Sequence, residues 1–160
     1  MGAIENDADN VKEAISSWDP GPSFSERRCH DSLERHLRNK FPKHTVVREH
    51  PVGRGRADLF IDFKDWTGFG AKVIVEVKYN LSDLNEYHRL VGQMHDYVTL
   101  GDAEPIIVLC GNTKSEIAAL VVERMAHVLR DRWFEKGAVI QMPITARAGN
   151  GRFINRTEAR

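Results

Sequence analysis

The feature that most constrains the fold is a run of three strand-like segments joined by short turns. Residues 45–52, 57–63 and 72–79 are rich in β-branched and aromatic side chains, as strands usually are. The glycine-containing turns at residues 53–56 and 67–70 are too short for a crossover helix, so the three strands must run antiparallel. We therefore predict an antiparallel meander, with the third segment well inside the sheet because it has the most β-branched residues.

Segments with the helical spacing of apolar residues surround this meander. They span residues 24–41, 82–100 and 115–134, with a shorter one at residues 11–18. Short apolar runs at residues 105–110 and 139–144 predict two further strands. A meander followed by crossover helices predicts an α/β fold, in which helices flank a mixed β-sheet.

Length and composition predict a single domain. The chain has 160 residues, of which 41% are hydrophobic and 29% are charged, and these values are ordinary for one packed globular unit. Residues 1–22 are polar and end in a Pro-Gly-Pro segment, so we predict an N-terminal extension with a short helix. Residues 23–145 form the predicted core, and residues 146–160 form an arginine- and glycine-rich tail.

The sequence also predicts a cytoplasmic protein without membrane contact. No stretch reaches the roughly 18 to 20 apolar residues that cross a bilayer, and the acidic N-terminus is unlike a basic signal peptide. Cys29 and Cys110 lie far apart and match no zinc-binding spacing, so both are expected to be buried thiols.

Charge is distributed unevenly, although the net charge is zero. Residues 27–56 contain nine Lys or Arg against three acidic residues, whereas residues 57–104 contain four against nine. A basic segment directly before an acidic one suits a protein that holds phosphates beside a cation. The alternative is that both segments are ordinary solvated surfaces.

Three charged residues of the meander indicate a chemistry. Asp58 lies in the second segment, and Glu76 and Lys78 lie two residues apart in the third, so these last two project to one face. Phosphodiester hydrolysis requires charge to be offset on the phosphoryl oxygens and water to be activated, and carboxylate-bound Mg²⁺ supports both. Asp58, Glu76 and the main-chain carbonyl of Val77 would supply the oxygen ligands that Mg²⁺ prefers. Lys78 would orient the attacking water or stabilise charge on the phosphate.

A purely structural alternative remains for Glu76 and Lys78. They could form a solvent-exposed ion pair on an edge strand, where such pairs are common. Burial of the same charges inside a sheet would be costly, because paired ions rarely repay their desolvation. Burial of Glu76 is therefore the property that separates the two interpretations.

The combination resembles the PD-(D/E)XK nuclease superfamily, whose signature is an Asp on one strand and an acid-x-Lys on the next. The resemblance covers roughly residues 23–110, with Ala57 standing where the signature has Pro, a position that often varies. It implies a restriction-endonuclease-like α/β fold and a nuclease that acts on DNA with Mg²⁺, for which Mn²⁺ could substitute. It implies no nucleotide cofactor.

Two helical segments extend the resemblance. Gln93 and Tyr97 match the QxxxY element of RecB-type and lambda-exonuclease-like members, share a helix face, and by resemblance support the site or contact DNA. Members also often carry a Glu on the first helix that reaches the metal, and Glu26 is our candidate, with Glu34 as the alternative. Ser23 and Glu26 also match a capping box, which would explain Glu26 without a catalytic role.

Several arginines are candidates for phosphate contacts. Arg54 and Arg56 lie in a glycine-containing turn directly before Asp58, where the backbone can approach a ligand closely. Arg27, Arg28 and Arg48 lie in the same basic segment. A tight hairpin with solvated arginines is the alternative interpretation.

Minimal members of the superfamily resolve branched DNA or act in repair and recombination, often as homodimers. A structure-selective nuclease similar to a Holliday-junction resolvase is therefore the favoured expectation. A RecB-like exonuclease, or a restriction or mobile-element defence nuclease, is the first alternative. The second is a member that has lost catalysis and serves as a DNA-binding or assembly subunit.

Overall fold

The computed structural model describes residues 7–20, 25–101, 103–128, 138–142 and 152–153. Its helices are α1 (Asp7–Ser16), α2 (Glu26–Lys40), α3 (Leu84–Thr99) and α4 (Ser115–Val128). Its strands are β1 (Thr45–Val52), β2 (Gly55–Asp62), β3 (Lys72–Tyr79), β4 (Glu104–Cys110), β5 (Ala138–Met142) and β6 (Arg152–Phe153).

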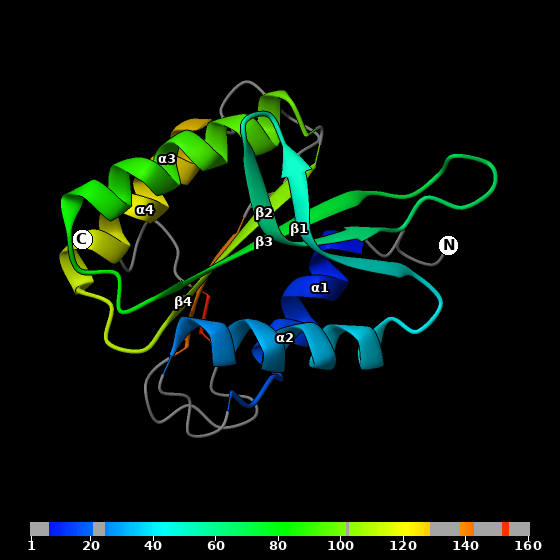
Figure 1. The fold of residues 1–160 in the computed structure, drawn as a ribbon, viewed down its shortest axis with the longest axis horizontal. Helices are drawn as coiled ribbons and strands as arrows, with labels where there is room; N and C mark the ends of the chain where they lie inside the picture. The colour runs from blue at the N-terminus through cyan, green and yellow to red at the C-terminus, as the bar shows by residue number, and fades with distance from the viewer. Residues whose placement is uncertain (1–6, 21–24, 102, 129–137, 143–151, 154–160) are drawn as a thin grey trace.

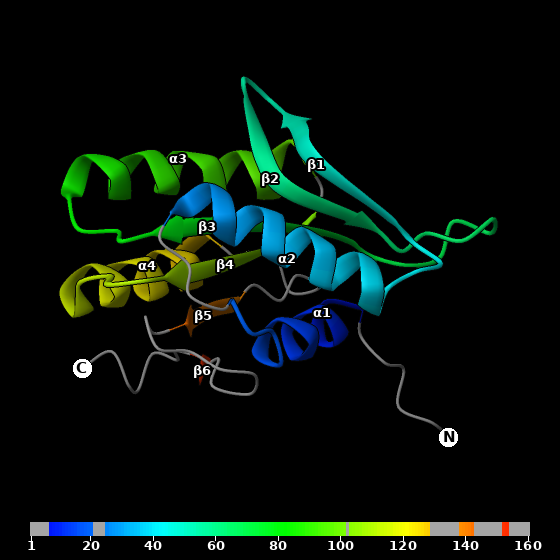
Figure 2. The ribbon, with the colours of Figure 1, turned by 60° about the horizontal axis from the view of Figure 1, so that its bottom comes forward.

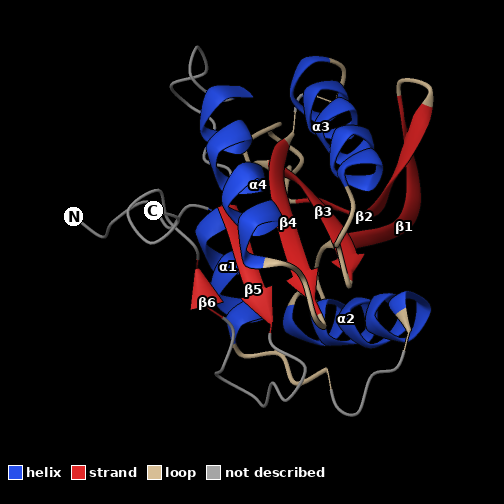
Figure 3. Cartoon of the chain, turned by 90° about the vertical axis from the view of Figure 1, so that its left-hand side faces the viewer, coloured by secondary structure: helices blue, strands red, loops and turns tan. Residues whose placement is uncertain are grey.

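The strands form one mixed sheet in the order β1-β2-β3-β4-β5-β6. β1, β2 and β3 pair antiparallel, β3, β4 and β5 pair parallel, and β6 returns antiparallel to β5. The sheet lies between α2 on one side and α3 on the other (Figures 1 and 3). The predicted meander and the predicted α/β arrangement of helices around a mixed sheet are confirmed.

Three buried apolar clusters lie on the two faces of the sheet, because side chains alternate along a strand. Val73, Val75 and Val77 of β3 pack in the core that contains α1 and α2. Ile74, between them in sequence, packs on the other face with Tyr97 of α3. β4 is buried along its whole length, as expected for a strand flanked by parallel partners and covered on both faces.

The N-terminal helix corrects one prediction. The core was expected to begin at Ser23, but Val11 and Ile15 of α1 are fully buried in the same apolar cluster as Leu33 of α2. Trp18, just after α1, is also buried and donates its indole N–H to Ser32 Oγ at 3.0 Å. A narrow apolar stripe in a polar segment was therefore sufficient to make α1 part of the core.

The cap of α2 also differs from the prediction. Ser25, rather than Ser23, is the N-cap residue, and its hydroxyl accepts a hydrogen bond from the Arg28 N–H at 3.2 Å. Glu26 is thus the first residue of the helix rather than the third partner of a capping box. The capping box does not explain why an acid stands at this position.

Some boundaries differ at the ends of the other elements. β2 begins at Gly55, two residues before the predicted start, and residues 152–153, predicted as part of the tail, form β6 beside β5. The predicted continuation of α4 to residue 134 and of the last strand to residue 144 lies outside the described residues. Among the described residues, no helix has the length and apolarity that crossing a bilayer requires.

The β1–β2 hairpin changes direction halfway along its length. Pairing runs from Thr45↔Asp62 to Arg48↔Leu59 and resumes at His50↔Ala57, and Glu49 between them has a positive φ of 51°. Beyond this point the hairpin stands beside α3 (Figures 1 and 2). The contact is close, since a Cβ added at Gly53 would be 2.7 Å from Leu100 Cδ1.

Candidate active site

Asp58 and Glu76 meet where the β2–β3 pairing ends. The last pair of the ladder is Leu59↔Val75, and Asp58 and Glu76 are the next residues on the two strands. At this point the backbone N–H groups of the two strands bond to carboxylates rather than to backbone carbonyls. Val77 N–H donates to Asp58 Oδ2 at 2.7 Å, and Asp58 N–H points to Glu76 Oε2 at 3.4 Å. The two predicted carboxylates therefore lie side by side.

Glu76 is buried, with 1% of its surface exposed. Tyr97 donates its hydroxyl proton to Glu76 Oε2 at 2.5 Å, and Lys78 Nζ donates to Glu76 Oε1 at 2.7 Å. β3 lies between β2 and β4 in the sheet. The structural alternative of an exposed ion pair on an edge strand is therefore wrong.

Lys78 places an ammonium group beside both carboxylates. Burial opposes its positive charge, but the charge and hydrogen bond of Glu76, together with the charge of Asp58, outweigh burial and raise the pKa of Lys78. The side chain is 18% exposed, so it is mostly but not fully buried. The site thus holds a cation beside its two carboxylates.

Asp58 is held in an environment that disfavours its charge. Burial, and then the negative charge of Glu76, raise the pKa of Asp58 from 3.8 to about 6. His30 and Lys78 act in the opposite direction through their positive charge. A further cation between the two carboxylates would relieve their mutual repulsion.

His30 of α2 is a site residue that the sequence did not single out. Its Nε2 lies 3.3 Å from Asp58 Oδ2 and 3.8 Å from Glu26 Oε1. This nitrogen is buried and makes no hydrogen bond of regular geometry. The available signal was its helical face, because His30 follows Glu26 by four residues and precedes Leu33, whose side chain is buried against the sheet.

The two candidate first-helix acids lie in different surroundings. Glu26 is exposed at the start of α2 and approaches the site through His30, and its charge also acts on Lys78. Glu34 lies two turns further along, where it accepts from Arg38 Nε at 3.1 Å. Of the two, Glu26 is the one beside the carboxylate pair.

Gln93 and Tyr97 lie one turn apart on α3, and the structure brings Tyr97 to the carboxylate pair. The Tyr97 hydroxyl lies near Glu76 and 3.4 Å from the main-chain oxygen of Arg56. Burial, and then the charge of Glu76, raise its pKa, so the hydroxyl remains a neutral donor. One turn before it, the side-chain oxygen of Gln93 is buried without a hydrogen-bond partner.

The arginines differ in their availability for phosphate. The Arg48 guanidinium donates to Asp31 and lies 3.4 Å from Glu34, so it connects β1 to α2. These two carboxylates would compete with a phosphate for Arg48. Arg56 lies 3.7 Å from Glu49 in an exposed pair, which is a weak contact. Arg54, Arg27 and Arg28 are exposed on the hairpin tip and the first turn of α2.

The donor set fits a divalent cation. Asp58 and Glu76 offer adjacent carboxylate oxygens, which Mg²⁺ and Mn²⁺ accept, and the imidazole of His30 is a further donor at 3.3 Å from Asp58. Within the described residues, no three His, Cys, Asp or Glu side chains already form an assembled metal-binding group. Two carboxylates with main-chain oxygen and water are nevertheless sufficient for Mg²⁺. The Val77 N–H donates to Asp58. That the Val77 carbonyl binds the metal remains a prediction.

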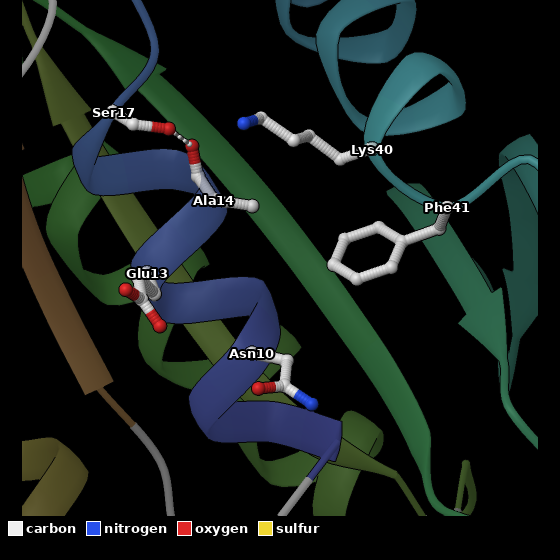
Figure 4. A pocket seen from close by; sticks show the side chains of 6 residues that line it. All are labelled: Asn10, Glu13, Ala14, Ser17, Lys40 and Phe41. Atoms are coloured by element: carbon white, nitrogen blue, oxygen red, sulfur yellow. Dashed lines mark hydrogen bonds between the residues drawn. The ribbon is translucent and has the colours of Figure 1, made fainter.

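A pocket of about 350 Å³ lies elsewhere, between α1 and the end of α2 (Figure 4). It is lined by Asn10, Glu13, Ala14, Ser17, Lys40 and Phe41. The Ser17 hydroxyl donates to the main-chain oxygen of Ala14 at 2.9 Å, and none of the lining residues belongs to the carboxylate pair. Its chemistry is weaker than that of the Asp58–Glu76 site, and we assign it no role.

Cys29 and Cys110 are both buried thiols, as predicted. Cys110, at the end of β4, lies beside Cys29 of α2, and its hydrogen bond with the Cys29 thiol, followed by burial, raises the pKa of Cys110. The thiols are therefore neutral apolar neighbours in the core rather than ligands of the site.

No family model matches the chain, and no curated protein matches it either. Interpretation of the site therefore depends on the geometry of its own residues.

Proposed function

We propose that this protein is a divalent-metal-dependent nuclease that hydrolyses phosphodiester bonds of DNA. The observation that carries the proposal is the convergence of Asp58, Glu76 and Lys78 where the β2–β3 pairing ends. On this proposal the mixed sheet is a restriction-endonuclease-like fold, with Mg²⁺ as cofactor and Mn²⁺ as a substitute.

A purely structural role explains this corner poorly. A buried carboxylate costs free energy unless it is paired and hydrogen-bonded, and apolar residues of the same size would stabilise the sheet at least as well. Glu76 is held on both oxygens by Tyr97 and Lys78, while Asp58 beside it has a raised pKa. Two neighbouring carboxylates with a fixed ammonium are what a catalytic cation site requires.

In the proposed site, Asp58 and Glu76 would hold the metal ion, and the His30 imidazole and the Val77 carbonyl would be the adjacent donors. A bound divalent cation offsets charge on a phosphoryl oxygen and lowers the pKa of its water. Lys78, whose side chain is 18% exposed, would stabilise the phosphate charge or orient the attacking water.

α3 provides the support for this arrangement. Tyr97 fixes the orientation of Glu76 through a hydrogen bond of 2.5 Å, and the buried side-chain oxygen of Gln93 would accept a hydrogen bond from an ordered water. This contact between the Gln93–Tyr97 helix and the carboxylate pair favours a second candidate, an exonuclease of the RecB type. A structure-selective endonuclease and an exonuclease differ in their need for a DNA end.

The first experiment measures cutting of supercoiled, linear, single-stranded and four-way-junction DNA with Mg²⁺, Mn²⁺ or EDTA. Asp58→Asn, Glu76→Gln and Lys78→Ala should each lower the rate by about a hundredfold or more. Asp62→Asn is the matched control, because Asp62 lies on the same strand outside the site, and it should cut like the wild type. Cutting of closed circles identifies an endonuclease, whereas cutting of linear DNA alone identifies an exonuclease.

A second measurement is independent of activity. Titration of the metal-free protein with Mn²⁺ should show binding that weakens in Asp58→Asn and persists in Asp62→Asn. If the wild type neither cuts any of these DNAs nor binds Mn²⁺, the proposal is wrong. DNA binding without cutting or metal binding would instead support a non-catalytic DNA-binding subunit.

A further inference from the structure

Two large aromatic side chains are exposed at the end of the β2–β3 hairpin. Trp66 is 96% exposed and Phe69 is 79% exposed. The hairpin projects well beyond the sheet, away from the helices, in two views of the molecule (Figures 1 and 2). We call residues 64–70 the aromatic tip.

The aromatic tip is an ordered turn. The Asp65 side chain accepts hydrogen bonds from the Thr67 N–H at 2.8 Å, from the Phe69 N–H at 3.2 Å and from the Thr67 hydroxyl. The Asp65 N–H donates to the Phe69 carbonyl at 2.8 Å. Gly70 has a φ of 126°, and a Cβ there would be 2.2 Å from the Phe63 carbonyl oxygen. The two rings are therefore presented on a rigid support.

The exposed area is small for a protein partner. Two aromatic side chains offer roughly 300 to 500 Å², whereas a stable protein interface usually buries about 800 Å² on each partner. Stacking on a nucleic-acid base requires only one aromatic face, and it tolerates any base because every base has a π-face. The area thus favours unpaired bases over a second copy of the chain.

The polar groups of the aromatic tip are compatible with this ligand. Its one acid, Asp65, is turned toward the backbone and hydroxyl of its own turn. Lys64, one residue before it, is exposed, and a lysine beside an aromatic ring can contact the phosphate of a stacked nucleotide.

The aromatic tip is rigidly connected to the candidate site, because Asp58 and Glu76 lie on the two strands that form the hairpin. Trp66 follows Asp58 by eight residues, which corresponds to roughly 26 Å along an extended strand. At 3.4 Å per nucleotide step, this distance is about eight base pairs of duplex. One DNA molecule could therefore reach both places.

We propose that Trp66 and Phe69 stack on unpaired bases of the DNA, within roughly eight base pairs of the bond that is cut. The substrate is then a DNA that combines a duplex with an unpaired segment, such as a flap, a junction or a single-stranded tail. This inference depends on the proposed nuclease function for the position of the cut, and it adds the substrate class.

Binding is tested with fluorescently labelled blunt duplex and with the same duplex carrying a single-stranded tail, both in EDTA. The wild type should bind the tailed DNA more tightly, because each stacked base strengthens binding by about fivefold or more. The double variant Trp66→Ala, Phe69→Ala should lose this preference and keep its affinity for the blunt duplex. Trp66→Phe should retain most of the preference, since it keeps a stacking ring.

Leu84→Ala provides the control, because Leu84 is an exposed apolar side chain on α3, away from the aromatic tip. It should bind both DNAs like the wild type. Thermal unfolding of each variant should be unchanged, which excludes misfolding as the cause of a lost preference. A preference for tailed DNA that survives in the double variant overturns the inference.

The test also separates this inference from the proposed function. If the wild type cuts DNA but the double variant binds and cuts tailed DNA equally well, only the inference about the aromatic tip fails. If tailed DNA is bound through the aromatic tip but no substrate is cut with Mg²⁺ or Mn²⁺, only the nuclease proposal fails. Sedimentation that shows a dimer lost in the double variant, with unchanged DNA preference, would identify a second copy as the partner and overturn base stacking.

Discussion

The two ends of the β2–β3 hairpin differ in which side chains they bury. At one end lie the charged residues Asp58, Glu76 and Lys78, of which Glu76 is buried and Lys78 is mostly buried. At the other end, Trp66 and Phe69 hold aromatic rings in solvent. Stability alone would favour the opposite arrangement, with the charges exposed and the aromatic rings buried, because burial stabilises apolar rings and destabilises charges.

This contrast indicates which parts of the molecule are candidate ligand sites. Both ends are well ordered by their own hydrogen bonds, the first through Tyr97 and the second through Asp65. Neither is therefore a region that merely failed to pack. Local departures from the burial rule that are held in place by specific contacts are typical of sites where a ligand completes the interaction.

Among changes at the two ends of the hairpin, the largest effect on stability is expected from Lys78→Met, which tests the contrast at its charged end. This change leaves Glu76 buried without its cation, and removing one partner of a buried pair costs about 3 kcal/mol or more. Urea unfolding at neutral pH measures the loss. Lys72→Met, at the other end of the same strand, is the control and should cost much less. Equal losses would show that Glu76 does not depend on Lys78.

A pH dependence should appear next. The pKa of Asp58 is raised from 3.8 to about 6 in the folded protein. Its stabilising contribution is therefore fully present below about pH 4 and is lost as the pH rises through about 6. Between these values, in EDTA, the free energy of unfolding of the wild type should fall relative to Asp58→Asn by on the order of 2 to 3 kcal/mol.

Unfolding in urea at a series of pH values measures this difference. His30, Glu76 and Lys78 also act electrostatically on Asp58. The free energy of unfolding of the wild type is therefore compared with that of Asp58→Asn at each pH. Above the pKa of Asp58, Mg²⁺ should raise the wild-type Tm and leave that of Asp58→Asn nearly unchanged, because the ion binds the folded state. Parallel pH curves for the two proteins would contradict the assignment of this pKa.

A smaller loss is expected from Tyr97→Phe, which removes one hydrogen bond to the buried carboxylate and keeps the ring. A hydrogen bond to a charged group contributes about 1.5 kcal/mol or somewhat more. Denaturant unfolding should show this loss, and the rate of DNA cutting should fall as Glu76 becomes less well oriented. Tyr87→Phe, on the same helix but outside the site, should change neither quantity appreciably.

The smallest effect is expected at the exposed end. Trp66→Ala should change the free energy of unfolding by less than about 0.5 kcal/mol, because the ring packs against little of the protein. Trp18→Ala removes the same residue type from the core and should cost about 3 to 5 kcal/mol. Similar losses for the two tryptophans would mean that the aromatic tip is structural, and the contrast between the two ends would disappear.

Much of the site could be predicted because strand geometry is regular. The segment at residues 72–79 was predicted with its observed bounds, and its alternation of side chains puts Glu76 and Lys78 on one face. Short turns forced the antiparallel meander, which brings Asp58 opposite Glu76. These inferences required only a period of two and a limit on loop length.

Other parts of the site depended on packing that no local pattern reports. The contact of His30 with Asp58 requires α2 to lie across the end of the β2–β3 ladder. Arg48, predicted to bind phosphate, pairs with Asp31 of the same helix, and this competition depends on the distance between β1 and α2. α1 joined the core although its segment is polar on average.

The sequence by itself determined the order of the elements, the antiparallel pairing of the meander and the types of side chain at the carboxylate pair, because turn length and residue alternation act over a few residues. Only the tertiary structure decided how deeply Glu76 is buried, which groups of α2 and α3 complete its surroundings, and how far the aromatic tip projects. Burial and charge balance depend on segments that are distant in the chain, and their relative placement results from the packing of the whole fold.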